Sequence, residues 1–179
     1  MSAAGWTERW RTVRARHAWV RWGVDLLVIF GLAAAVMSWQ TRHLPAAGTP
    51  APPFALRTLS GETVRLESLR GRPVVLAFWA PWCTVCKAES HNLSALKERA
   101  GERAHVLSVA VAYDDVEEVR RFAREQGVDY PVLLGDDALQ RAYRVDSFPT
   151  TLFLSSEGRV KRAAVGYTTQ VGLLWRFWL

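Results

Sequence analysis

The chain has 179 residues, of which 50% are hydrophobic and 22% are charged, a composition typical of a globular protein rather than a disordered one. Its formal net charge of +6 lies mainly at the amino end, because residues 1–44 hold six arginines against Glu8 and Asp25. No stripe of basic and aromatic side chains follows residue 45, so the sequence predicts no nucleic-acid partner.

An almost uninterrupted apolar run extends from Trp22 to Trp39. A helix of this length is about 27 Å long, close to the thickness of a bilayer's hydrocarbon core. The run is followed closely by Arg42 alone and is preceded by Arg9, Arg11, Arg14, Arg16 and Arg21. Under the positive-inside rule, this distribution keeps the amino terminus in the cytoplasm. A cleaved signal peptide and a buried helix of a soluble protein are the alternatives.

We therefore predict a basic cytoplasmic segment at residues 1–21 and a single transmembrane helix at residues 22–40. The chain after this helix is expected on the periplasmic or extracytoplasmic side of the cytoplasmic (inner) membrane. Residues 41–53 contain four of the chain's eight prolines and predict a semi-rigid linker. The domain is expected to cover residues 54–179.

Strand and helix patterns alternate in this domain, which predicts an α/β fold. The valine-rich apolar runs Pro73–Trp79 and Val106–Ala112 are typical of central strands covered on both faces, and helical spacing fills Cys86–Ala100 between them. Further along the chain, we expect helices at 115–125, 137–143 and 169–179, and strands at 132–134, 151–154 and 160–164. The last two strands are joined by a turn at 155–158.

The chain has two cysteines, Cys83 and Cys86, three positions apart. Two cysteines are too few for a disulfide-stapled scaffold or a four-cysteine zinc site, so a redox pair remains. Cys83 lies where a strand passes into a helix, and unpaired N–H groups with the helix dipole lower the pKa of such a thiol below its usual value of about 8.5. We predict that Cys83 is the more exposed, attacking sulfur and that Cys86 is the buried, resolving thiol. We expect no cofactor besides the Cys83–Cys86 disulfide, and no metal.

Two short motifs resemble those of the thioredoxin superfamily. The residues Phe78–Cys86 (FWAPWCTVC) are similar to its active-site strand, turn and helix, and Phe148-Pro149-Thr150 is similar to its cis-proline loop. The resemblance covers residues 50–179 and implies a thioredoxin-like fold, in which helices flank a central mixed sheet. It also implies that an extended substrate peptide binds near Trp82, Phe148, Pro149 and Thr150.

Finer features resemble two branches of this superfamily. The expected anchor, the proline-rich segment and the Cys-x-x-Cys-x-x-Glu pattern of Cys83, Cys86 and Glu89 are similar to the TlpA/ResA branch. The segment Gly166–Thr169 and the tryptophan-rich end resemble ScsD-type protein disulfide oxidoreductases.

The carboxylate that serves the buried thiol differs from that of thioredoxin, which has an aspartate where this chain has Ala77. The resemblance implies that Glu89 replaces it as a catalytic residue and relays the proton of Cys86. A solvated helix glutamate is the alternative. For Trp79, a wall of the active-site groove is expected, with core packing as the alternative.

These features predict a thiol-disulfide oxidoreductase that reduces disulfides of exported proteins and receives electrons from an integral membrane thiol donor. A disulfide oxidase and a cytochrome c maturation thioredoxin are the main alternatives. A copper-binding module is less favoured, because a third ligand has no evident place. A thiol peroxidase is also less favoured, since Ala80 stands three residues before Cys83, where a peroxidase motif has threonine.

Overall fold

The computed structural model describes residues 22–36, 38 and 41–178 and divides into two units, Met1–Gln40 and Thr41–Leu179. In the first unit, residues 22–36 are helical and their side chains are exposed. No helix within the described residues has the length and apolar character needed to cross a bilayer. The predicted transmembrane helix at 22–40 includes residues 37, 39 and 40, which lie outside the described residues, as does the predicted segment 1–21.

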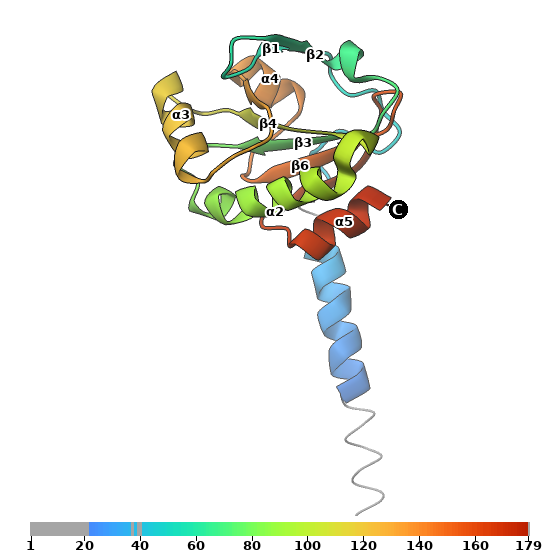
Figure 1. The fold of residues 1–179 in the computed structure, drawn as a ribbon. Coiled ribbons are helices and arrows are strands. Elements are labelled where there is room, and N and C mark those ends of the chain that lie inside the picture. The colour runs from blue at the N-terminus through green and yellow to red at the C-terminus, as the bar shows by residue number, and fades with distance from the viewer. Residues whose placement is uncertain (1–21, 37, 39–40, 179) are drawn as a thin grey trace, which may run out of the picture. The chain divides into compact units, whose positions relative to one another are not determined.

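A mixed five-stranded sheet forms the centre of the second unit (Figure 1). In spatial order its strands are β5 (Val132–Leu134), β4 (His105–Ala110), β3 (Val74–Trp79), β6 (Thr150–Leu154) and β7 (Val160–Val165). The first three strands run parallel, whereas β6 is antiparallel to both β3 and β7. All six residues of β3 are buried, because neighbouring strands and both covering layers enclose it.

Helices cover both faces of this sheet, as the resemblance implied (Figure 1). One face packs against α2 and α5, and the opposite face packs against α4 and the β1–β2 hairpin. The helices are α2 (Thr84–Ala100), α3 (Val116–Glu125), α4 (Asp137–Ala142) and α5 (Gln170–Trp178). The remaining elements are β1 (Ala55–Arg57), β2 (Thr63–Arg65) and two 3-10 turns, η1 (Leu66–Leu69) and η2 (Gly101–Arg103).

The segment predicted as a linker, residues 41–53, packs on the domain. Leu44 and Ala51 are buried in the core, and the N–H groups of Gly48 and Ala51 donate to the carbonyls of Val160 and Gly158 at 2.7 and 3.0 Å. A proline-rich segment can lie along the edge of a sheet because its remaining N–H groups still donate, here to the edge strand β7 and to the turn before it. The compact unit therefore begins at Thr41 and not at the predicted Phe54.

Candidate active site

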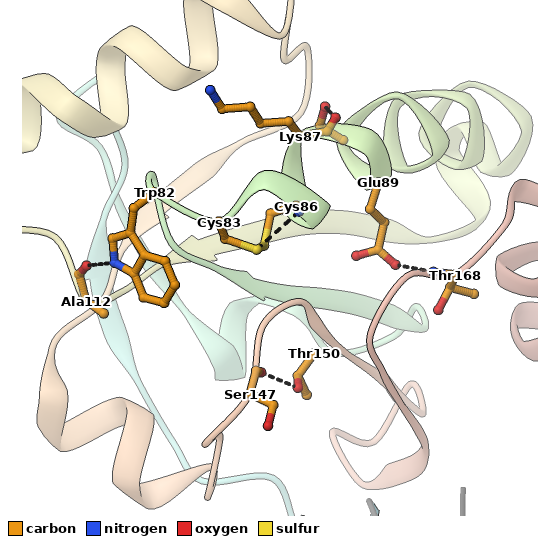
Figure 2. Close-up of a disulfide and its surroundings, with 10 residues drawn as sticks. Trp82, Cys83, Cys86, Lys87, Glu89, Ala112, Ser147, Thr150 and Thr168 are labelled. Carbon is orange, nitrogen blue, oxygen red and sulfur yellow. Dashed lines mark hydrogen bonds between the residues drawn. A yellow bond between two sulfur atoms is a disulfide. The ribbon is translucent and has the colours of Figure 1, made fainter.

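Cys83 and Cys86 form a disulfide at the amino terminus of α2, with their Cα atoms 5.3 Å apart (Figure 2). Cys83 has extended backbone angles and occupies the N-cap position, where its Sγ accepts the N–H of Cys86 at 3.2 Å. The sulfur thus takes the place of the oxygen that usually caps a helix. After reduction, the same N–H and the helix dipole favour a thiolate at Cys83.

Both cysteines are buried, which limits how a partner can reach them. Cys83 exposes 6% of its surface and Cys86 3%, so the order of exposure is the predicted one, although the difference is small. They share a cluster with Trp79, Ala80 and Phe122. A partner sulfur must therefore approach at the limited surface that Cys83 offers.

Trp82 lies on the surface beside the disulfide, with 66% of its area exposed. Its indole N–H donates to the Ala112 carbonyl at 2.9 Å, and the edge of its ring meets Phe148, with 5.8 Å between the ring centroids. Ala112 has a φ of 51°, a left-handed conformation that costs a residue with a Cβ about 1 kcal/mol or more. Such strain is common at functional sites, and here it lies at the residue that holds Trp82.

Trp79 belongs to the core, so the prediction of a groove wall is wrong for this residue. It exposes 4% of its surface and stacks on Phe122 at 4.0 Å between ring centroids. The reason is its position in β3, where its side chain points to the face that α3 covers.

The predicted cis-proline loop lies at the same end of the sheet as the disulfide, because Thr150 pairs with Phe78 in register. The Phe148–Pro149 peptide is cis, and Figure 2 shows this loop facing the disulfide. Pro149 and Thr150 are buried, and the Thr150 hydroxyl donates to the Ser147 carbonyl at 2.8 Å. Phe148 is half-buried and contacts Trp82. The Thr150 side chain instead stabilises the loop from within.

A groove of about 500 Å³ borders Trp82 on the side of α3. Its charged lining comes from α2, from α3 and from the loop before α3. These side chains are Lys87, Asp114, Glu118, Arg121 and Glu125. Sequence reasoning did not find this groove, because its lining comes from segments separated along the chain.

Glu89 lies one turn beyond Cys86 on α2 and exposes only 1% of its surface. Its Oε1 accepts the N–H of Thr168 at 3.1 Å (Figure 2). Burial raises the pKa of Glu89 to about 7, against the opposing effect of the Thr168 amide and hydroxyl, which favour the ionised form. The alternative of a solvated surface glutamate is therefore wrong.

The sheet face under the first turns of α2 carries small side chains in a row. Ala77, at the position of the thioredoxin aspartate, pairs with Ser108 on β4 and with Thr151 on β6. The buried hydroxyls of Ser108 and Thr151 have no partner among the described residues. This row contains no carboxylate. Among the described residues, the acidic group nearest to Cys86 in sequence is the buried Glu89, three positions further along α2.

A thioredoxin-like sheet, a disulfide at a helix amino terminus and a cis-proline loop together define a thiol-disulfide oxidoreductase. Residues 47–163 match the AhpC/TSA family. Since this match covers more than half of the chain, the protein belongs to that family. Relatives named ResA from Geobacillus thermodenitrificans and Oceanobacillus iheyensis are 30% and 34% identical, and the matches cover 84% and 81% of those chains, so the protein belongs to the TlpA/ResA branch.

Two curated relatives come from Bacillus subtilis. The thioredoxin-like protein YneN is 34% identical over 125 residues, which cover 69% of this chain and 74% of YneN. The thiol-disulfide oxidoreductase ResA is 29% identical over 161 residues, which cover 88% of this chain and 89% of ResA.

A solved structure of a secreted Mycobacterium tuberculosis disulfide oxidoreductase, homologous to Escherichia coli DsbE, is also similar. It is 27% identical, with a TM-score of 0.63, and the match covers 69% of this chain and 93% of that one. The chain is therefore a thiol-disulfide oxidoreductase with a thioredoxin-like fold.

We predict that Glu89 makes the stability of the oxidised protein depend on pH. A carboxyl with a pKa of about 7 when folded, against 4.5 as its ordinary value, stabilises the fold below about pH 4.5 and loses this contribution as the pH rises towards 7. The loss corresponds to about 3 kcal/mol. Urea unfolding of the full chain in detergent, at a series of pH values, measures it.

The Glu89→Gln variant keeps the size of the side chain but cannot ionise, so it is expected to lose less stability than the native chain over this range. Glu98→Gln is the matched control, because Glu98 lies exposed on the same helix. Parallel stability curves for the native chain and Glu89→Gln would contradict the prediction.

Proposed function

We propose that this oxidoreductase reduces disulfides of exported proteins, with Cys83 as the attacking sulfur and Cys86 as the resolving one. The observation that carries the assignment of the two sulfurs is the Cys86 N–H directed at Cys83 Sγ at 3.2 Å, at a helix amino terminus. This contact favours negative charge on Cys83 rather than on Cys86, which lies within the first turn.

The reaction has two exchange steps. The Cys83 thiolate attacks one sulfur of the substrate disulfide, forms a mixed disulfide and releases the other substrate sulfur as a thiolate. The Cys86 thiolate then attacks Cys83 Sγ, which forms the Cys83–Cys86 disulfide and releases the second substrate sulfur. Two electrons pass to the substrate, whose two thiolates take up two protons, and the protein ends oxidised.

Glu89 acts as the base for the second step. Cys86 must lose its proton before it can attack, and a buried carboxyl with a pKa of about 7 is partly ionised at neutral pH. When a donor later reduces the disulfide, Cys86 leaves as a thiolate and the protonated Glu89 returns the proton.

The substrate peptide binds between the exposed Trp82 ring and the cis-proline loop. Trp82 and Phe148 offer adjoining aromatic surface beside Cys83. The backbone next to Pro149 and Thr150 receives the extended peptide, as in the thioredoxin superfamily.

Residues 22–40 anchor the protein in the cytoplasmic membrane as a single span, with the amino terminus inside. The apolar run, the exposed apolar side chains of residues 22–36 and the arginines before the run support this topology. An integral membrane thiol protein then regenerates the dithiol from the same membrane. The carboxyl-terminal segment makes an ScsD-type protein the finer assignment that we favour.

Disulfide oxidation and cytochrome c maturation use the same exchange chemistry. The direction of electron flow depends on the relative stability of dithiol and disulfide, which the residues Thr84 and Val85 between the cysteines do not determine. Reduction is favoured because a tethered domain suits electron delivery from a membrane donor.

Single cysteine variants of the full chain test the two sulfur roles. Cys83→Ser is expected to lose exchange with a model protein disulfide such as insulin, down to the background rate. Cys86→Ser is expected to accumulate mixed disulfides in exporting cells, seen as bands on non-reducing gels that dithiothreitol removes. The double variant is the control. If Cys83→Ser accumulates the bands and Cys86→Ser does not, the roles are reversed.

A reporter fusion tests the topology. Alkaline phosphatase fused after Leu179 is expected to be active, because this enzyme folds only after export, and the fusion should stay in washed membranes. Deletion of residues 22–40 should leave the reporter inactive. An active fusion released as a shortened soluble chain would show instead that the segment is a cleaved signal peptide.

A further inference from the structure

The connection between β7 and α5, residues 166–169, bonds to two separate parts of the active site. We call it the 166–169 loop. The N–H of Gly166 donates to the carbonyl of Pro149 at 2.8 Å, and the N–H of Thr168 donates to Glu89 at 3.1 Å. The loop therefore links the cis-proline loop to the buried carboxylate of α2.

Asn92 of α2 bonds to the carbonyl of Thr168, the residue whose N–H bonds to Glu89. Its Nδ2 donates to the Thr168 carbonyl at 3.0 Å and to the Tyr167 hydroxyl at 3.2 Å. Both hydrogens of the amide nitrogen can therefore be used. Asn92 is half-buried and Thr168 exposes only 6% of its surface, so the bond to the Thr168 carbonyl is partly shielded from water, whereas Tyr167 is exposed.

Glu89 and Asn92 are three positions apart on α2, so their side chains lie on the same face of the helix. Glu89 accepts from the N–H of Thr168, and Asn92 donates to its carbonyl. Fixing both groups of one residue fixes the orientation of both peptide planes that flank it. Without the bond from Asn92, the carbonyl of Thr168 could rotate, and its N–H would no longer be held towards Glu89.

The chain on either side of Thr168 is anchored independently of Asn92. Gly166 bonds to Pro149, and Thr169 caps α5 by accepting the N–H of Gly172 at 3.2 Å. In α5, Leu173 is fully buried among Leu93 and Leu96 of α2. Loss of the Asn92 amide is therefore expected to change the orientation of Thr168 without releasing the loop.

We propose that Asn92 is a positioning residue for disulfide exchange, which keeps the Thr168 N–H directed at the Glu89 carboxylate. The proposal rests on the proton transfer by Glu89 proposed above. A hydrogen bond from an N–H stabilises the ionised carboxylate more than the neutral carboxyl, so losing it makes Glu89 ionise at a higher pH. The pH at which the exchange rate rises should therefore be higher as well.

Other titratable groups near Glu89 do not account for such a shift. Tyr130, before β5, interacts electrostatically with Glu89 in the described structure, but burial raises the pKa of this phenol, which keeps it neutral. Cys86, one turn earlier on α2, is the thiol that Glu89 serves. Lys87 and His91 are exposed on the same helix.

The experiment is the pH dependence of insulin reduction by the reduced full chain in detergent, between about pH 5 and 9. The native rate should rise with pH through the ionisation of Glu89. In Asn92→Ala this rise should move to higher pH by about half a unit or more, which lowers the rate near pH 6 about threefold and leaves it unchanged near pH 9. An unmoved rise would overturn the proposal.

Two further variants separate the bond from the shape of the side chain. Asn92→Asp keeps the size but replaces the donor by an acceptor, so its shift should exceed that of Asn92→Ala. Asn92→Gln keeps the donor on a longer side chain and should retain most of the native profile. His91→Ala is the control, because it removes a neighbouring exposed titratable side chain and should leave the rise in place.

A double variant distinguishes positioning from a general structural effect. In the Glu89→Gln background, Asn92→Ala should cause no further loss at any pH. If it lowers the rate there by the same factor as in the native chain, Asn92 acts independently of Glu89 and the proposal is overturned.

The direct titration of the Glu89 carboxyl carbon by 13C NMR keeps the two proposals separate. If Glu89→Gln leaves the rate profile unchanged, the proton role of Glu89 fails. The NMR titration then still tests whether Asn92 positions the Thr168 N–H, since Asn92→Ala should move the Glu89 titration to higher pH. An unmoved titration would overturn the positioning role.

Discussion

At the amino terminus of α2, Cys83 Sγ accepts the N–H of Cys86, and the chemistry of the pair depends on this contact. It requires Cys83 to be the residue that caps the helix, directly after the turn that follows β3. All six residues of β3 are buried, and its pairing with β4 and β6 fixes where the strand ends. Because Phe78 pairs with Thr150, the same register brings the cis Phe148–Pro149 peptide to this end of the sheet.

The second constraint is the burial of a carboxyl one turn behind the resolving cysteine. An acidic group in this environment ionises near neutral pH, which suits a group that must both accept and return a proton. Its ionised form depends on a single described backbone donor, the N–H of Thr168. The 166–169 loop thereby connects the acid–base group to the cis-proline loop through Gly166 and Pro149.

The sequence predicted the elements that carry strong local patterns. Continuous valine-rich runs indicated β3 and β4, and the cysteine spacing between them indicated the start of α2. The β1–β2 hairpin was not predicted, because each strand has three residues, too few for an alternating pattern. The partner of Glu89 was also out of reach, since Thr168 lies 79 positions further along the chain. Trp79 and Trp82 are the same residue type, so the sequence could not show which one is buried. Trp79 is in the core because it belongs to β3, whereas Trp82 follows in the turn and is exposed.

The reduction potential of the Cys83–Cys86 pair decides whether the protein reduces or oxidises its substrates. It is measured on the full chain in detergent, equilibrated in glutathione or dithiothreitol buffers. We predict a value near or below that of thioredoxin, about −270 mV, as a reductase fed across the membrane requires. A value near −120 mV would contradict it and would identify an oxidant instead.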